Sequence, residues 1–355
     1  MTGARLASVP RARRQERDGR GTAVWETMGV ESLLVTVGGG HLEELWLLRP
    51  RLVGIADEVT WVAPDTPHSR SLLGGERRLD IPLCEPRDVR ATITVTRQAL
   101  EVVRRGRWHS VVSTGSLPAV PYLVTARARG IPAHYIETAA RVHGASLTAR
   151  LLERVPGVHR YGQWPAWQRD GWSYRGSVLD GFRARPRPDP VLRRVVVTVG
   201  TNRYGFRRMV EAVARALPPG VEVTWQTGFT DVSGLDLASS RLLASEVLFD
   251  AMRRADVVVS HAGVGSAITA LRAGKVPVLV PRRRAHGEHV DDHQEEIASS
   301  MAQAGLAVAA EAGDLDLGML LAAAGQQVVR PDDAPPFVLD GGTPPAAAAP
   351  SGRSH

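Results

Sequence analysis

The sequence has 355 residues, enough for two domains of ordinary size, and its 43% hydrophobic and 23% charged residues exclude a chain that is disordered throughout. The formal net charge is +7, of which residues 1–20 supply +4 through six arginines and two acidic residues. No basic stretch with interleaved aromatic residues follows, so nucleic acid is not predicted as a partner. Cys84 is the only cysteine, which excludes a disulfide framework, and no run of 18 apolar residues predicts a transmembrane helix.

The two ends of the chain differ in composition from the rest. Residues 1–27 are rich in Arg and Gly without periodicity, and we expect a disordered basic tail. No apolar segment precedes Trp25, so a signal peptide is not predicted and a cytoplasmic location is expected; translation could begin at Met1 or Met28. Residues 331–355, rich in Pro, Ala and Gly, are likewise predicted to be disordered.

Between the tails, short β-branched runs alternate with helical patterns, which favours parallel α/β sheets. In the first domain, 28–180, the predicted strands are 32–37, 58–63, 110–113 and 132–136, and the predicted helices are 41–52, 93–105 and 118–129. Residues 181–193, with their prolines and arginines, suit a linker. In the second domain, 194–330, the strands are 194–199, 221–226, 241–243, 256–260 and 276–280, and the helices are 206–216, 246–254, 266–273 and one that ends near 304. Two Rossmann-like domains are therefore expected, with ligands beyond the carboxyl ends of their strands.

The strongest motif is SHAGVGS, residues 260–266, between a strand and a helix. Gly263 and Gly265 allow a ligand to approach the backbone closely, and the free N–H groups of the following helix suit a diphosphate. Ser266 could cap this helix and also donate to a phosphate. The alternative is a glycine-rich turn without a ligand. The spacing matches neither the Walker A motif nor GxGxxG, which disfavours ATP and NAD.

A second polar cluster, HGEHVDDHQEE, follows the next strand at residues 286–296. His289 and His293 would lie one turn apart on a helix, so a metal site is one interpretation. The HExxH pattern of a metalloprotease is absent, and Asp291 or Asp292 could instead cap the helix, with Glu295 following. Polar groups such as those of Gln294 and the carboxylates bind adjacent sugar hydroxyls well. We favour sugar recognition, and no metal ligand is assigned.

A third motif, GGGHLEE at residues 38–44, follows the first strand. Its glycines are expected to form a cleft wall, and His41 would lie at a helix start, where a neutral imidazole facing the cleft can act as a general base. A local hydrogen bond is the alternative role for a single histidine. Three weaker signals also follow predicted strands, at residues 113–118, 137–141 and 200–203.

These motifs carry a resemblance to a glycosyltransferase family. One set resembles the acceptor-binding, membrane-associating subunit of two-part bacterial exopolysaccharide glycosyltransferases, and comprises 36–44, 111–118, 135–150 and 163–167. A second set resembles the donor-binding partner subunit, and comprises 198–206, 260–281 and 286–298. The likeness extends to the eukaryotic enzyme that adds the second N-acetylglucosamine to dolichol-linked chitobiose, and more distantly to the enzyme that forms lipid II. Together they cover most of residues 31–310.

The resemblance implies a GT-B fold, an α/β architecture of two Rossmann-like domains facing a central cleft. It implies an inverting, metal-independent hexosyltransferase of cell-surface polysaccharide biosynthesis that uses a UDP-sugar and a polyprenyl-diphosphate-linked saccharide, with no cofactor. With both functions in one chain, no obligate partner subunit is expected. The implied donor-binding residues are Gly200, Thr201, His261, Gly263, Gly265, Ser266, Arg282, Glu288, Asp292, His293 and Gln294. The implied acceptor-binding residues are Gly39, Gly40, Glu44, Thr114, Gly115 and Arg141, and the base is His41, which we favour, or Glu137.

Two departures from the relatives stand out. Thr269 occupies the place where the relatives carry a glutamate that binds the ribose, three residues after Ser266. The membrane span of the eukaryotic acceptor subunit is absent, so the Arg-rich tail is expected to supply peripheral contact with the inner face of the cell membrane. The tryptophans Trp164, Trp167 and Trp172 could lie at the same interface or could equally belong to the core. The alternatives are a nucleotide-sugar epimerase of the same fold, a non-catalytic sugar-nucleotide-binding protein, and a transferase acting on a soluble acceptor.

Overall fold

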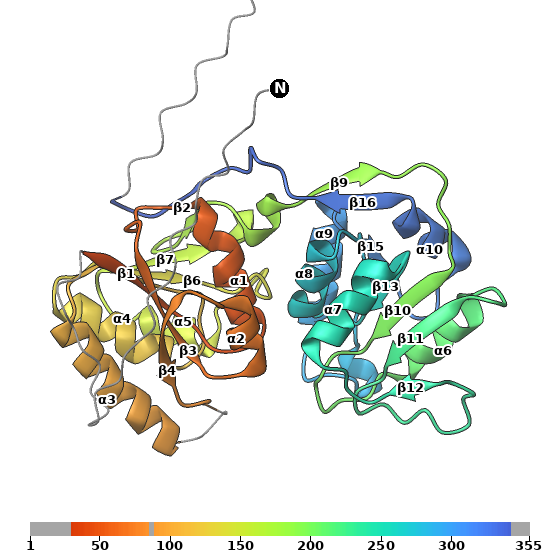
Figure 1. Cartoon of the computed structure of the whole chain (residues 1–355), viewed down its shortest axis with the longest axis horizontal. Coiled ribbons are helices and arrows are strands. Elements are labelled where there is room, and N and C mark those ends of the chain that lie inside the picture. The colour runs from red at the N-terminus through yellow and green to blue at the C-terminus, as the bar shows by residue number, and fades with distance from the viewer. Residues whose placement is uncertain (1–29, 85–88, 342–355) are drawn as a thin grey trace, which may run out of the picture.

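The structure, a computed structural model, describes residues 30–84 and 89–341. The chain forms two lobes, each built around a largely parallel sheet with helices packed against it, and the lobes face each other (Figure 1). The N-terminal lobe runs from red to yellow in the figure and the C-terminal lobe from green to blue.

The N-terminal lobe contains a seven-stranded sheet in which every neighbouring pair is parallel. From edge to edge its strands are β4 (Arg77–Ile81), β3 (Val59–Pro64), β1 (Glu31–Val35), β5 (Trp108–Ser113), β6 (Ala133–Ile136), β7 (Val158–Gly162) and β8 (Ser173–Tyr174). The central strand β1, ESLLV, is buried along its whole length, as expected of a parallel strand covered by helices on both faces.

The helices of this lobe connect successive strands. They are α1 (Gly40–Leu48), α2 (Pro67–Leu72), α3 (Val89–Arg105), α4 (Ala119–Ala128) and α5 (Leu147–Leu152), with the 3-10 turns η1 (Arg49–Arg51), η2 (Pro165–Trp167) and η3 (Val178–Gly181). In α3, the residues Val95, Ala99, Val102 and Val103 are buried at helical spacing, so one stripe of this helix faces the core.

The C-terminal lobe repeats the same topology in a six-stranded parallel sheet. From edge to edge its strands are β12 (Ser239–Ser240), β11 (Glu222–Gln226), β10 (Arg194–Thr198), β13 (Val257–Ser260), β14 (Val278–Leu279) and β15 (Val308–Ala309). Its helices are α6 (Arg207–Ala216), α7 (Ser245–Arg254), α8 (Val264–Arg272), α9 (His293–Gln303) and α10 (Leu317–Ala324), with the 3-10 turn η4 (Arg284–His286). In each lobe the first strand lies at the centre and the order reverses there, which is the Rossmann arrangement.

The chain crosses between the lobes twice, and the two crossings are paired. Strand β9 (Arg183–Pro186), in the segment predicted as a linker, pairs antiparallel with β16 (Gln326–Val329) on the returning segment. Figure 1 shows these two strands side by side along one edge of the molecule. The connection between the lobes is therefore a hydrogen-bonded ribbon.

The segment after residue 330 corrects one expectation. The whole of 331–355 was predicted to be disordered, yet β17 (Phe337–Val338) pairs in parallel with β2 (Leu52–Val53) of the N-terminal lobe. Phe337 and Leu339 are fully buried there. Composition misled the prediction because two buried apolar side chains are enough to hold a short proline-rich segment on a lobe. Residues 342–355 and the predicted tail 1–27 lie outside the described residues.

The structure decides between the two positions left open for the tryptophans. Trp164, Trp167 and Trp172 are 8%, 1% and 4% exposed, and the rings of the last two lie 4.4 Å apart. Each indole N–H donates to a protein oxygen. These residues therefore form part of the N-terminal core, where buried indoles satisfy their polar edge internally. Among the described residues, no helix is long and apolar enough to cross a membrane.

Candidate functional site

A cavity of about 720 Å³ lies between the two lobes. Its walls come from segments that follow the carboxyl ends of β1 and β3 in one lobe and of β10 and β13 in the other. The lining residues that the sequence singled out are Gly39, Gly40, Gly200, Thr201, His261, Gly263, Gly265, Ser266 and Thr269. The structure thus brings together the three loops that carry Gly39, Gly200 and Gly263. They lie beyond the carboxyl ends of strands, where open α/β sheets bind ligands.

The loop between β13 and α8 presents a free helix end to this cavity. Ala262 has a positive φ of 56°, which turns the chain sharply out of the strand, and Gly263 is the N-cap of α8 without any side-chain cap. The N–H groups of the first helical turn are therefore left for a ligand, and the helix dipole favours a negative one. Ser266 lies in this first turn rather than at the cap, and it too lines the cavity.

The His261 ring is held between two glycines. A Cβ on Gly200 would lie 2.4 Å from the ring carbon Cε1, and a Cβ on Gly263 would lie 2.4 Å from Nε2. No other residue type fits at either position without moving the ring. Burial, and then the neighbouring Arg282, lowers the pKa of His261 to about 3, so the imidazole is neutral at physiological pH. Its buried Nδ1 has no partner within the described part of the chain.

Across the cavity, His41 lies in the first turn of α1 on the other lobe. Its Nδ1 lies 2.9 Å from the carbonyl oxygen of Thr114, and the Thr114 hydroxyl donates to the His41 carbonyl at 2.8 Å. Because a carbonyl only accepts, Nδ1 donates to it, which leaves Nε2 as the ring nitrogen that can take a proton. Gly115, with a φ of 119°, leaves no side chain beside this ring. A Cβ there would lie 3.3 Å from Cε1 of His41.

The two helix ends approach each other closely. A Cβ on Gly40 would lie 3.8 Å from the Cα of Gly265, and the reverse distance is the same. Figure 1 shows α1 and α8 on facing sides of the two lobes. Glycine at both positions therefore lets the backbone of the first turn of α1, with His41, lie directly opposite the first turn of α8. His41 itself is half-buried and is not among the residues that line the cavity.

Two predicted carboxylates have internal roles. Glu137 is 1% exposed and accepts hydrogen bonds from the Tyr135 hydroxyl and from the N–H groups of Thr138 and Ser146. Glu44 is likewise buried and accepts from the Thr138 hydroxyl, among other donors. Burial raises the pKa of Glu44. Both carboxylates are buried and hold the loop after β6 in place, whereas His41 is half-buried, so His41 stays the candidate base.

Arg141, predicted to contact the acceptor, lies on this same loop. It is half-buried, and its backbone carbonyl accepts from the Trp167 indole. It does not line the cavity between the lobes.

In the predicted sugar-binding segment after β14, several polar groups bind the protein itself. Glu288 accepts from Arg208 at 2.8 and 2.9 Å and from the Arg283 N–H. Gln294 accepts from the Arg282 N–H at 3.0 Å, and Asp292 from the Arg284 N–H at 2.8 Å. None of the predicted donor residues of this segment lines the cavity. Sequence spacing could not reveal this, because the partners lie up to 80 residues away.

Arg282 is another predicted donor ligand that faces inward. It is fully buried, and its Nη2 donates to the carbonyls of Val199 and Tyr204 at 2.7 and 3.0 Å. Burial lowers the pKa of its guanidinium to about 10. Because these two carbonyls lie in the loop that carries Gly200 and Thr201, Arg282 fixes the shape of that loop from behind rather than touching the cavity.

The cavity also contains a carboxylate that sequence reasoning missed. Glu43 of α1 lines the cavity and pairs with Arg272 of α8 across the lobes. Its carboxylate also lies 3.3 Å from the hydroxyl of Thr269, the residue at the position of the relatives' glutamate. The sequence contains two adjacent glutamates. Glu44 faces inward and Glu43 faces α8, and predicting this would have required the exact residue at which α1 begins.

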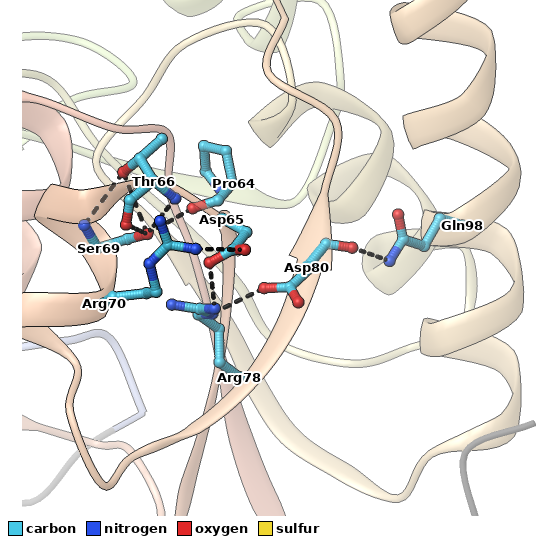
Figure 2. A network of polar contacts seen from close by, with 8 residues as sticks. All are labelled: Pro64, Asp65, Thr66, Ser69, Arg70, Arg78, Asp80 and Gln98. Atoms are coloured by element: carbon cyan, nitrogen blue, oxygen red, sulfur yellow. Dashed lines mark hydrogen bonds and ion pairs between the residues drawn. The ribbon is translucent and has the colours of Figure 1, made fainter. Parts of the chain in front are cut away.

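Helix α2 forms the outer part of the N-terminal wall, with Thr66 and His68 among the lining residues. Figure 2 shows how this wall is held: Thr66 and Ser69 form a capping box, and Asp65 pairs with Arg70 and Arg78. Arg78 also pairs with Asp80, whose carbonyl accepts from the Gln98 amide of α3. The short helix is therefore tied to the strand and helix beside it.

Comparison with known proteins agrees with this geometry. Residues 194–317 match the glycosyltransferase family 28 C-terminal domain. The matched region contains β10, the α8 loop and the segment after β14. This match covers the lobe that carries the free helix end and the glycine pair around His261.

Among curated proteins, the chain is 31% identical over 237 residues to the UDP-N-acetylglucosamine–N-acetylmuramyl-(pentapeptide) pyrophosphoryl-undecaprenol N-acetylglucosamine transferase of Synechococcus sp. (strain CC9902). The match covers 61% of this chain and 62% of that protein, so the chain spans somewhat less than two thirds of the length of this relative.

Among solved structures, MurG of Acinetobacter baumannii superposes with a TM-score of 0.50 at 20% identity, over 82% of this chain and 89% of that one. A UDP-N-acetylglucosamine 2-epimerase superposes with a TM-score of 0.52 at 12% identity, over 83% and 86%. The predicted GT-B fold is confirmed by these neighbours. Since a transferase and an epimerase share it, the fold alone does not decide the reaction.

Proposed function

We propose that this protein is a UDP-sugar-dependent hexosyltransferase that acts on a polyprenyl-diphosphate-linked saccharide. The observation that carries the proposal is the facing pair of uncapped helix ends, with α8 presenting free N–H groups to the cavity and α1 presenting His41 opposite them. The matched C-terminal domain family and the undecaprenol-linked substrate named for the Synechococcus relative support it.

The donor diphosphate binds at the first turn of α8. The N–H groups around Gly263, Gly265 and Ser266 donate to its oxygens, and the helix dipole stabilises the charge that develops as UDP departs. The neutral His261 ring beside Gly200 adds a nearby donor. This arrangement needs no metal ion on the diphosphate, because the backbone supplies the positive potential.

The nucleoside end extends toward Thr269, where Glu43 supplies a carboxylate from the opposite lobe. A carboxylate accepts two hydroxyls of a ribose well. In this proposal the donor site is completed only when the lobes are in contact, because Glu43 belongs to α1 and its partner Arg272 to α8.

The acceptor hydroxyl enters from the side of the N-terminal lobe. With Nδ1 bound to the Thr114 carbonyl, Nε2 of His41 takes the hydroxyl proton, and the oxygen attacks the anomeric carbon from the face opposite UDP. One displacement inverts the anomeric configuration. A lipid-linked acceptor places the reaction at the membrane surface, for which we propose a peripheral location on the cytoplasmic face and a role in cell-surface polysaccharide assembly.

The test is UDP release from a panel of UDP-hexoses, with and without a polyprenyl-diphosphate disaccharide and with and without EDTA. The proposal predicts release that depends on the lipid acceptor, continues in EDTA, and yields a product of inverted anomeric configuration by NMR. Turnover of UDP-sugar without acceptor would favour the epimerase instead. Activity abolished by EDTA would contradict the metal-free mechanism.

A further inference from the structure

We propose that His289, Asp291 and His293 form a binding site for a divalent transition-metal ion of the zinc type, outside the cavity between the lobes. Their candidate ligand atoms all lie within 4.8 Å of one another. Nδ1 of His289 lies 3.0 Å from Oδ1 of Asp291, and Nδ1 of His293 contacts the same oxygen. Two imidazole nitrogens and one carboxylate oxygen thus lie close enough together to bind one ion.

The sequence alone suggested a different arrangement of these histidines. In one interpretation of the sequence, one turn of helix separated His289 from His293; in the other, Asp291 or Asp292 capped the helix. The structure has Asp292 as the N-cap of α9, which begins at His293, and the preceding residues form a loop. This loop brings in Asp291, which an i, i+4 helical pair would not include. The ligand set is therefore His–x–Asp–x–His, with alternate residues converging.

The residues between and beside the three ligands explain why they converge. Glu288 binds Arg208, Asp292 binds the Arg284 N–H, and Gln294 binds the Arg282 N–H. Each of these anchors binds back onto the C-terminal lobe. With the anchors fixed, the alternate side chains are directed away from them and toward one another. The site is pre-organised by contacts in which the three ligands take no part.

The chemistry of the set selects the class of ion. Neutral imidazole with one carboxylate suits zinc and related first-row ions, whereas magnesium and calcium prefer oxygen ligands alone. Ligands of a tetrahedral zinc ion lie about 3.4 Å apart, given bonds of about 2.1 Å. The His289–Asp291 separation of 3.0 Å is close to that value, whereas Nδ1 of His293 contacts the same oxygen more closely and must move back to admit the ion. On binding, each imidazole proton moves from Nδ1 to Nε2, so no oxidant or reductant is required.

The surroundings leave room for a fourth ligand. The side chains of His289, His293 and Asp291 are 10%, 24% and 43% exposed, so water can complete the coordination from the open side. On the closed side the Tyr204 ring packs against the His289 ring, with centroids 5.7 Å apart. Arg282 is the neighbouring cation, and its guanidinium is directed to the carbonyls of Val199 and Tyr204.

None of the three ligands lines the cavity between the lobes. The ion holds the loop before α9 against the C-terminal lobe. The inference does not rest on the proposed transferase function, since it concerns a different set of residues and a different ligand.

Cobalt(II) titration of the full-length chain, after chelator treatment, tests the proposal by the visible absorption of the bound ion. We expect one ion per chain with a tetrahedral or five-coordinate spectrum, displaced by Zn²⁺, and a rise in Tm on adding Zn²⁺. His289→Ala and the isosteric Asp291→Asn should each weaken binding at least tenfold and remove the Tm rise.

His286→Ala is the matched control, because His286 is an exposed histidine in the same segment outside the cluster, and this variant should bind as the wild type does. Circular dichroism of the metal-free variants separates a lost site from a lost fold. Cobalt binding that is equal in the wild type, His289→Ala and Asp291→Asn would overturn the proposal, as would loss of binding in His286→Ala alone.

Discussion

Gly200→Ala tests the packing around His261 most sharply. Gly200 has a φ of 74°, and a Cβ there would lie 2.4 Å from the imidazole Cε1 and 2.7 Å from Nε2. The ring cannot simply move toward Gly263, because that residue also lies close to it. The added methyl group must therefore push the ring into the cavity or distort the loop that carries Thr201.

The expected cost has two parts. An alanine in the left-handed region costs about 1–2 kcal/mol, and forcing a methyl group into a filled space costs roughly 1–3 kcal/mol more. Displacing His261 also removes a donor near the diphosphate. One hydrogen bond to a charged group contributes about 1.5–3 kcal/mol, which corresponds to UDP affinity weakened roughly tenfold to a hundredfold or more.

Gly305→Ala is the matched control. Gly305 has a φ of 70° and nothing within 4 Å of an added Cβ, so only the backbone cost applies. Urea unfolding and UDP titration calorimetry on both variants separate the two contributions. Gly200→Ala should lose more stability than Gly305→Ala and should alone lose UDP affinity. Equal stability losses, or UDP binding within twofold of wild type in Gly200→Ala, would refute the packing argument.

Three further predictions concern the base, pH and the returning strand. His41→Gln should lower kcat roughly 10²–10⁴-fold without changing UDP affinity, measured by UDP release and calorimetry; a parallel loss of affinity would show that His41 is not the base. The pKa of His261 is lowered to about 3, so the folded protein holds this ring neutral where the unfolded chain would protonate it. The fold therefore has its full stability above pH 6.5 and loses stability as pH falls toward 3. Between pH 7 and 5, wild type should lose about 2 kcal/mol more than His261→Gln in urea unfolding, and equal losses would contradict the burial argument. Phe337→Ala should lower the free energy of unfolding by about 3–5 kcal/mol, since Phe337 is fully buried with its ring 5.8 Å from that of Tyr161. Val338 is half-buried, so Val338→Ala should lower it clearly less. A loss for Phe337→Ala as small as that for Val338→Ala would mean that β17 contributes little to stability.

The central strands were predictable because their chemistry is local. Runs such as VVVT at 195–198 are β-branched and bounded by turn residues, and they become buried strands within a residue or two of the predicted limits. The edge strand RRLDI of β4 and the short helix α2 were missed. Their residues are mostly polar or half-buried, so no period of two or 3.6 marks them.

The glycine positions of the candidate site were also predictable, since a strand-to-helix turn that faces a ligand needs them. The polar residues were harder to assign. Glu44, Glu137 and Glu288 have the side chains of ligand-binding residues, yet all three are buried. Glu44 and Glu288 bind partners far away in the chain, whereas Glu137 binds partners within nine residues. Whether a carboxylate faces a cavity or the protein depends on helix phase and on distant partners, neither of which spacing reveals. Glu43 was missed for the same reason.

The central claim is that the backbone N–H groups at the start of α8 bind a diphosphate. Calorimetric titration with UDP, UMP and uridine at one ionic strength tests it directly. The account predicts that UDP binds at least tenfold more tightly than UMP, and that uridine binds most weakly, because each phosphate adds charge-assisted hydrogen bonds at the helix end. Equal affinity for UDP and uridine, or no binding of either, would contradict it.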